Sequence, residues 1–279
     1  MNIEVDALDR SKSLTNAKSK RDDNAAVTLS LDAFVRSIGV RRTAPIAFFL
    51  GAGASTTSGI PSAQMCVWEW KRQIFLTNNP GLEEQFAEIS LIDVRRRIQG
   101  WLERQPGYPK EGAADEYGFY IRQCFPIEED RRVYFQGLVR NASPHIGYKL
   151  LCHLAEADLM KSVWSPNFDG LSARAAGAFK LTPIEVGIDT QHHLRAVNKG
   201  ELLCVSLHGD YRYDKLMNTP DELQRQEAKL RAALIAEVKD TSLVVVGYSG
   251  RDASLMAALK DGYHQPGSGV LYWCGFGDE

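Results

Sequence analysis

The sequence lacks any close pair of cysteines. The five stand far apart, at Cys66, Cys124, Cys152, Cys204 and Cys274. An odd number of isolated thiols argues against a disulfide framework and against a cysteine-based zinc site. Cys204 and Cys274 lie within apolar runs, where a thiol generally acts as a small buried hydrophobe. We therefore expect a protein of the reducing cytoplasm that binds no metal.

The chain also lacks a surplus of charge of one sign and any long apolar stretch. Its 33 Lys and Arg nearly balance 35 Asp and Glu, which argues against a general polyanion-binding protein. The longest apolar runs, Ala44–Leu50 and Leu243–Val246, are far shorter than the roughly 20 residues that cross a bilayer. The acidic start, Met1–Asp6, does not read as a secretory signal. No membrane association is therefore expected.

What the sequence does contain is a series of short apolar runs typical of buried strands. The clearest, Ala44–Leu50, is continuous and stops at a glycine, as in a strand buried on both faces of a parallel sheet. Similar runs occupy residues 162–164, 202–207, 242–246 and 270–274, and helical patterns begin near residues 30, 143, 220 and 252. This alternation predicts an α/β fold, a Rossmann-like doubly wound parallel sheet.

Two segments do not follow the alternation. Residues 1–28 are polar and rich in charge, so we expect a mobile N-terminal arm or partner-binding segment before a catalytic domain over 29–279. Residues from about 82 to 140 contain no convincing buried strand and predict a mostly helical insertion subdomain, with Arg95–Arg97 on a solvated helix face. The chain stops just after an apolar run, which leaves a longer parent protein open.

The most informative segment is the glycine-rich loop Gly51–Ser62, directly after the first predicted strand. Glycines and small residues let the backbone approach a diphosphate closely, with its N–H groups toward the phosphates. The dinucleotide pattern G-x-G-x-x-G is incomplete because Thr56 holds the third glycine position, and no P-loop Gly-Lys-Ser/Thr follows. By itself the loop predicts either a nucleotide site or a tight turn without ligand.

Three further polar, glycine-bearing loops each follow a predicted strand, at Ser165–Asp169, Leu207–Asp210 and Gly247–Asp252. Ligands of doubly wound sheets bind outside the carboxyl ends of the strands, so the four loops are predicted to converge on one crevice. The third of these loops has a partial likeness to the nucleophile elbow G-x-S-x-G. Arg251 stands at its second glycine position and only His264 follows, which disfavours that hydrolase chemistry.

Taken in order, these loops resemble the motifs of the sirtuin family. The motifs are Gly51-Ala-Gly-Ala-Ser55, Gly59-Ile60-Pro61, Pro166-Asn-Phe-Asp169, His208-Gly209 and Gly247-Tyr-Ser249. They are most similar to those of the sirtuin-like NAD-cleaving domains of bacterial antiphage defence systems. The likeness runs from about Phe48 to Asp252, and the predicted arm and insertion have no part in it.

The resemblance implies a role for each matching residue. It implies that Gly51, Ala52, Gly53 and Ser55 contact the NAD diphosphate and that Gly247 and Ser249 contact the adenosine half. Ile60 and Pro61 also belong to the implied NAD-binding residues. Asn167 and Asp169 would line the nicotinamide-ribose pocket, and His208 would be the catalytic base. A neutral imidazole can take a proton from water or a ribose hydroxyl at neutral pH, and an amide can orient water without titrating.

The chain departs from deacylating sirtuins in two places. They carry a four-cysteine zinc module after the catalytic His-Gly, whereas the first cysteine after His208 here is Cys274. They also have Asp-Phe-Arg after Gly-Ile-Pro, where this chain has Ser62–Gln64. Because the zinc module supports the acyl-peptide groove, these departures favour a zinc-free NAD glycohydrolase that gives nicotinamide and ADP-ribose.

Two other functions stay open on the sequence. One is a non-catalytic module that senses NAD or ADP-ribose, and the other is a zinc-free protein deacylase. Since uncontrolled loss of NAD would harm the host, the resemblance also implies regulation, through a homo-oligomer or a partner defence protein, including activation by nucleic acid through such a partner. Preference for NAD over NADP, and hydrolysis over cyclisation, are left undecided.

Overall fold

The computed structural model describes residues 3–6, 27–40, 46–209, 228–264 and 269–275. Within them lies a sheet of eight strands in the order β2-β1-β8-β7-β3-β4-β6-β5. The strands are β1 (Ile3–Asp6), β2 (Val27–Leu29), β3 (Ile46–Leu50), β4 (Met160–Ser165), β5 (Thr182–Val186), β6 (Glu201–Ser206), β7 (Ser242–Val246) and β8 (Leu271–Cys274). The six strands from β8 to β5 are parallel, and β1 and β2 join antiparallel at the β8 edge. The predicted α/β class is confirmed.

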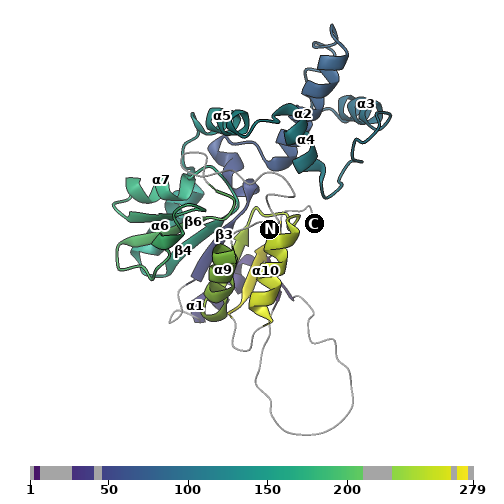
Figure 1. The fold of residues 1–279 in the computed structure, drawn as a ribbon. Helices are drawn as coiled ribbons and strands as arrows, with labels where there is room; N and C mark the ends of the chain where they lie inside the picture. The colour runs from purple at the N-terminus through teal and green to yellow at the C-terminus, as the bar shows by residue number, and fades with distance from the viewer. Residues whose placement is uncertain (1–2, 7–26, 41–45, 210–227, 265–268, 276–279) are drawn as a thin grey trace, which may run out of the picture.

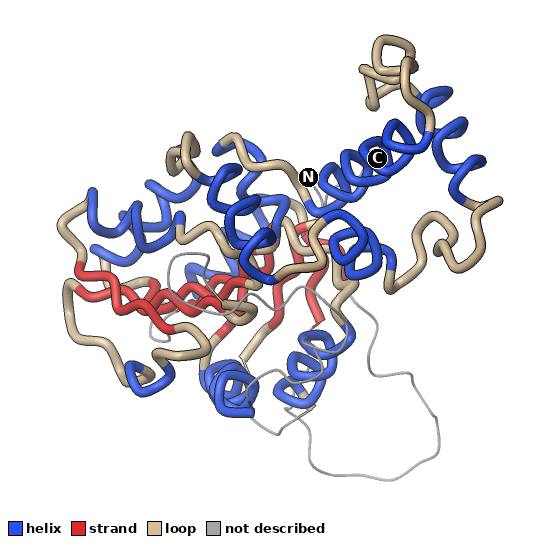
Figure 2. The backbone as a smooth tube through the Cα atoms, turned by 45° about the horizontal axis from the view of Figure 1, so that its top comes forward, coloured by secondary structure: helices blue, strands red, loops and turns tan. Residues whose placement is uncertain are grey.

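Helices cover both faces of the parallel sheet (Figures 1 and 2). On one face lie α1 (Leu31–Val40), α6 (Ile146–Glu156) and α7 (Leu171–Ala178), and on the other lie α9 (Ala228–Asp240) and α10 (Ala253–Tyr263). Successive residues of β3 alternate between these layers, because Ile46 and Leu50 pack with the first set while Phe49 packs with the second. The apolar run that was predicted to form a strand buried on both faces is β3, and both of its faces are covered.

The chain changes faces beside β3. It passes from β3 to β4 by way of α6, whereas the connections into β7 and β8 pass through α9 and α10 on the other face. The boundary between β3 and β7 is therefore the point at which the winding reverses, and ligand sites of such sheets lie outside the strands' carboxyl ends there.

The predicted helical insertion is present, and it is larger than expected. It comprises α2 (Ala63–Asn78), α3 (Ile92–Leu102), α4 (Glu116–Cys124) and α5 (Glu128–Val139), above the carboxyl ends of the strands in Figure 1. Its own core contains Trp70, Tyr120 and Phe135, so α2 packs with the insertion. Of the arginine triplet, Arg96 and Arg97 are exposed as predicted and Arg95 is half-buried; Arg95 and Arg97 also lie over the rings of Trp68 and Phe86. No strand occurs among residues 63–139, all of which the structure describes.

Two sequence expectations need correction, and a third lies partly outside the described residues. The segment predicted to be a mobile arm supplies β1 and β2, because the free edge of β8 offers unpaired backbone groups; residues 7–26 lie outside the described chain. The helix expected to begin at Ser143 begins at Ile146 instead, since the His145 N–H donates to Ser58 Oγ rather than entering a cap at Ser143. Residues 220–227 of another expected helix are not described, and α9 is described from Ala228.

Candidate functional site

Four strands end at the same level of the sheet. Leu50 of β3 is in register with Val246 of β7, and Ser165 of β4 is in register with Ser206 of β6. The Leu207 N–H also donates to Ser165 O at 2.8 Å, so the chain after β6 runs beside the chain after β4. The four polar loops predicted from the sequence therefore start from one edge.

The glycine turn after β3 is packed directly against the loop after β7. The N–H groups of Gly51 and Gly53 donate to Val246 O and Gly247 O, at 2.9 and 2.8 Å. A Cβ on Gly51 would lie 2.4 Å from Tyr248 Cα, and one on Gly247, whose φ is +66°, would lie 2.3 Å from Ala54 N. The contact between the two loops is thus sufficient to require glycine, and it uses two of the N–H groups that the sequence assigned to a diphosphate.

Ser55, in the 3₁₀ helix η1 (Ala52–Ser58), is the centre of a buried hydrogen-bond network. Its Oγ donates to Asp169 Oδ2 at 2.6 Å and accepts from Asn167 Nδ2 at 3.0 Å. Tyr148 Oη lies 2.9 Å from the same Oγ and must be the donor, because the single serine hydrogen is already used. Burial and the charge of Asp169 raise the pKa of Tyr148 far above its usual value, which keeps the phenol protonated.

The orientation of the Asn167 amide is fixed by its partners. Its Nδ2 donates to Gly51 O at 3.0 Å as well as to Ser55 Oγ, and a peptide carbonyl can only accept. Both amide hydrogens are therefore used, and Oδ1 has no hydrogen-bonding partner among the described residues. Asn167 consequently presents an unused acceptor in a pocket that it lines.

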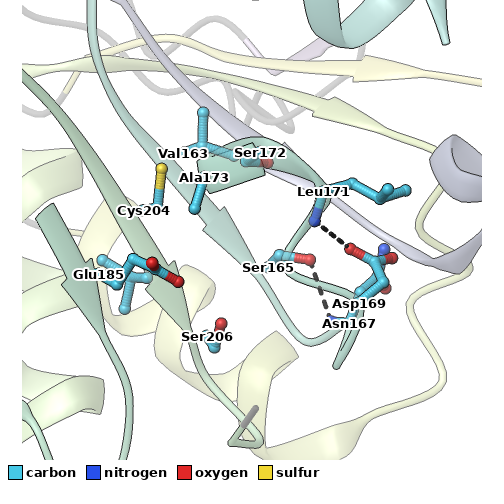
Figure 3. Close-up of a pocket in the computed structure, with 12 residues that line it drawn as sticks. Val163, Ser165, Asn167, Asp169, Leu171, Ser172, Ala173, Glu185, Cys204 and Ser206 are labelled. Atoms are coloured by element: carbon cyan, nitrogen blue, oxygen red, sulfur yellow. Dashed lines mark hydrogen bonds between the residues drawn. The ribbon is translucent and has the colours of Figure 1, made fainter. Parts of the chain in front are cut away.

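The Asp169 carboxylate, 7% exposed, is committed to protein groups. Oδ2 accepts from Ser55, and Oδ1 accepts from the N–H of Leu171 at 2.9 Å, in the first turn of α7. Figure 3 shows this second bond beside the one from Asn167 N to Ser165 Oγ. Asp169 therefore holds the loop after β4 in place and brings a negative charge to it.

Asn167 and Asp169 border a pocket of about 310 Å³, part of it open to solvent, at the ends of β4, β5 and β6 beside α7. Figure 3 shows Asn167 and Asp169 on one side and Glu185, Cys204 and Ser206 on the other. The lining is formed by Val163, Ser165, Asn167, Asp169, Gly170, Leu171, Ser172, Ala173, Glu185, Cys204, Val205 and Ser206. The glycine turn and His208 are outside this lining, so the described residues do not enclose all four loops in one pocket.

His208, 8% exposed, contacts a residue that the sequence did not single out for the site. Its Nε2 lies 2.9 Å from Oδ2 of Asp252, the N-cap of α10. Burial tends to raise the pKa of Asp252, but His208 and the N–H groups of Leu255 and Ser254 together leave that pKa below its ordinary value. The sequence marked Asp252 only as a helix start, because nothing local distinguishes a cap that also contacts a distant histidine.

The remaining predicted binding residues are less closely engaged. Ile60 is partly buried against the first core, and its N–H donates to Ser55 O at 3.3 Å. Ser249 is exposed, and neither it nor Pro61 forms a side-chain hydrogen bond within the described chain. Thus Gly51, Ser55, Asn167 and Asp169 form one hydrogen-bonded cluster, and no bond among the described residues joins the Ser249 side chain to it.

The described residues meet the requirements neither for a metal site nor for a membrane-spanning helix. Among the residues that the structure describes, no three His, Cys, Asp or Glu side chains are grouped so that they could hold a metal ion. None of the helices in the described part of the chain has the length and apolarity needed to span a membrane.

Comparison with known proteins gives a partial family match. Two solved structures, a Sir2–p53 peptide–NAD⁺ complex and Sir2Tm bound to a propionylated peptide, are 16% identical to the chain, with 84% of each chain covered and TM-scores of 0.38 and 0.35. No curated protein sequence matches. A family model described as the SIR2-like domain matches residues 161–276, the part of the chain that contains Asn167, Asp169, His208 and Gly247.

Proposed function

We propose that this protein hydrolyses NAD to nicotinamide and ADP-ribose. The observation that carries the proposal is the Asn167 amide, whose two hydrogens are held by Gly51 O and Ser55 Oγ while its Oδ1, at a pocket, accepts from none of the residues that the structure describes. An acceptor held in this way can receive a hydrogen from a water molecule and direct its oxygen. The match of residues 161–276 to the SIR2-like domain supports NAD as the molecule attacked.

The reaction needs one bond to break and one to form. The bond between ribose C1′ and the nicotinamide nitrogen breaks, its electron pair neutralises the pyridinium, and positive charge develops on the ribose. Water bound to Asn167 Oδ1 forms the new bond to C1′, and its proton passes to the imidazole of His208. General base catalysis of this kind contributes about 10²- to 10⁴-fold in rate.

The residues around Ser55 keep this arrangement rigid. Tyr148 and Asn167 both donate to the Ser55 hydroxyl, which donates to Asp169, so a change at any member disturbs Asn167. Because both Asp169 oxygens already accept protein hydrogen bonds, its assigned role is to offset the ribose charge and to position Ser55.

For the rest of the dinucleotide we propose the glycine turn and the loop after β7. Gly51, Gly53 and Gly247 contribute through their missing side chains, because the N–H groups of the first two bind protein carbonyls. Ala52, Ile60 and Pro61 extend the surface for the diphosphate, and Gly247 and Ser249 that for the adenosine half. No zinc takes part.

We further propose that this activity is the regulated effector of a bacterial antiphage system in the cytoplasm. The proposal rests on the resemblance of the loop motifs to NAD-cleaving defence domains. Control would come from a homo-oligomer or a partner defence protein, with any nucleic acid acting through that partner.

A nicotinamide-release assay tests the proposal. The purified protein, with and without candidate partners, is expected to release nicotinamide without an acylated peptide, and both His208→Ala and Asn167→Ala are expected to abolish that release. His153→Ala, at an exposed histidine paired with Glu156, serves as the matched control and retains activity. NAD binding without turnover would instead indicate a sensing module, and release only with an acyl-lysine peptide would indicate a deacylase.

A further inference from the structure

The loop after β6 and the loop after β7 meet through His208 and Asp252, although β4 and β3 lie between those strands in the sheet. Both side chains are about nine-tenths buried, with 10% and 12% of their side-chain surface exposed. The 2.9 Å between Nε2 and Oδ2 is an ion-pair distance, but the oxygen lies off the direction of the ring N–H. Neither atom has a hydrogen-bonding partner elsewhere in the described chain. Buried polar atoms are rarely left unpaired, so these two are suited to each other.

We infer that Asp252 is a positioning residue, which holds the His208 imidazole with its proton on Nε2 and so leaves Nδ1 as the base. This inference rests on the proposed function, because it specifies which ring nitrogen accepts the proton in NAD hydrolysis. A carboxylate can only accept a hydrogen bond, and a neutral imidazole carries one N–H and one lone pair. The nitrogen that faces Asp252 therefore carries the hydrogen, and the lone pair is on the opposite nitrogen.

The position of Asp252 makes it a rigid support. Its other oxygen, Oδ1, accepts from the N–H groups of Ser254 and Leu255 at 2.9 and 3.1 Å and caps α10. The loop that leads to Asp252 is in turn held to the glycine turn through Gly247 O and the Gly53 N–H. The carboxylate thus connects the imidazole to a helix end and to the packed loops.

The two oxygens also separate two roles that a simple truncation would confuse. Asp252→Ala removes the helix cap and the histidine contact together. Asp252→Ser keeps a good N-cap, but its side chain is too short to reach His208. Asp252→Asn keeps the cap through its one amide oxygen, but it then turns an N–H donor, Nδ2, toward His208.

A role limited to capping predicts that Asp252→Ser behaves like the native protein. Positioning of His208 predicts that Asp252→Ser lowers kcat about 100-fold or more with little change in KM, at a melting temperature close to the native one. Asp252→Asn should lose at least as much kcat, because its Nδ2 donor would hold the imidazole with the proton on Nδ1. Native kcat in Asp252→Ser would overturn the inference.

A spectroscopic measurement decides the same question without turnover. In NMR of the protein with isotopically labelled histidine, with the His208 signals assigned by their loss in His208→Ala, the neutral ring is expected to carry its proton on Nε2. Asp252→Ser is expected to give a mixture of tautomers. A native ring protonated on Nδ1 would contradict the inference. If the native protein released no nicotinamide, the proposed function would fail, and the tautomer would still report on the Asp252 contact.

Discussion

The Ser55 hydroxyl donates its hydrogen to Asp169 Oδ2 across 2.6 Å and joins two strand ends that are 114 positions apart in the sequence. This bond determines the direction of the neighbouring ones, since Tyr148 and Asn167 can then only donate to Ser55. Together with the Gly51 carbonyl, which can only accept, it leaves Asn167 Oδ1 as the acceptor that faces the pocket.

Removal of that hydroxyl tests the network. Ser55→Ala leaves the buried Asp169 Oδ2 without its donor, and we expect it to lower the free energy of unfolding by about 1–3 kcal/mol. Tyr148→Phe, which removes one donor and leaves no carboxylate unpaired, should cost about 1 kcal/mol. The double variant should lose less than the sum, because the two changes remove one shared bond. Fully additive losses in urea unfolding would exclude the predicted coupling.

The close approach of the two glycine loops predicts a steric effect. The Cβ of Gly51→Ala would meet Tyr248 Cα and Gly247 O at 2.4 and 2.5 Å, so a backbone shift is required. We expect a loss of about 1–3 kcal/mol or more in unfolding free energy. Gly137→Ala is the control, since its Cβ meets nothing within 4 Å and the position is inside a helix. Equal melting temperatures for the two variants would contradict the loop contact.

The helical insertion contains a buried charge pair whose removal should be costly. Lys71, 1% exposed, donates to Gln99 Oε1 at 2.8 Å, contacts the Glu116 carboxylate and lies over the Trp68 ring. Lys71→Met leaves the Glu116 carboxylate buried without a cationic partner, with only the Gly112 N–H as a donor, and is expected to cost about 3–5 kcal/mol. Lys71→Met combined with Glu116→Leu should recover much of that loss. Chemical denaturation in which the double variant is less stable than Lys71→Met would refute this reasoning.

A pH dependence of stability is expected from Glu237 of α9. Burial raises its pKa, and the bond from Ser162 Oγ at 2.6 Å only partly offsets that shift. The folded state therefore holds a proton that the unfolded chain loses near its ordinary pKa of about 4.3, so the contribution to stability decreases as the pH rises above that value. Glu237→Gln should match the native protein near pH 4 and exceed it at neutral pH. A native advantage that grows with pH in urea titrations would show the opposite sign.

The sequence predicted those elements whose signal is local. The β3 run is apolar throughout because both of its faces are covered, and α10 begins beside Asp252, where a helix was expected. In contrast, β5 was not predicted, since Pro183 and Glu185 interrupt its apolar pattern, as an edge strand permits. Strands β1 and β2 do alternate apolar and polar residues, but each run is very short and stands in a polar segment, so neither was predicted.

The site was predictable as a set of loops, but its contacts were not. Motif order placed Ser55, Asn167 and Asp169 at strand ends, where the structure joins them. Tyr148 is a residue of α6 and Asp252 is the N-cap of α10, and neither belongs to these motifs. Only the folded chain therefore reveals their partners. The sequence assigned the glycines to diphosphate binding. The structure gives a second reason for glycine at these positions, the close contact between the two loops, which cannot be recognised from one sequence.

The most direct test of the central claim is the mass of the product formed from NAD in water enriched with heavy oxygen. Hydrolysis predicts one heavy oxygen in ADP-ribose, one nicotinamide released for each NAD consumed, and no product from Asn167→Ala. Unchanged NAD from the active assembly, or a product without the heavy oxygen, would contradict the account.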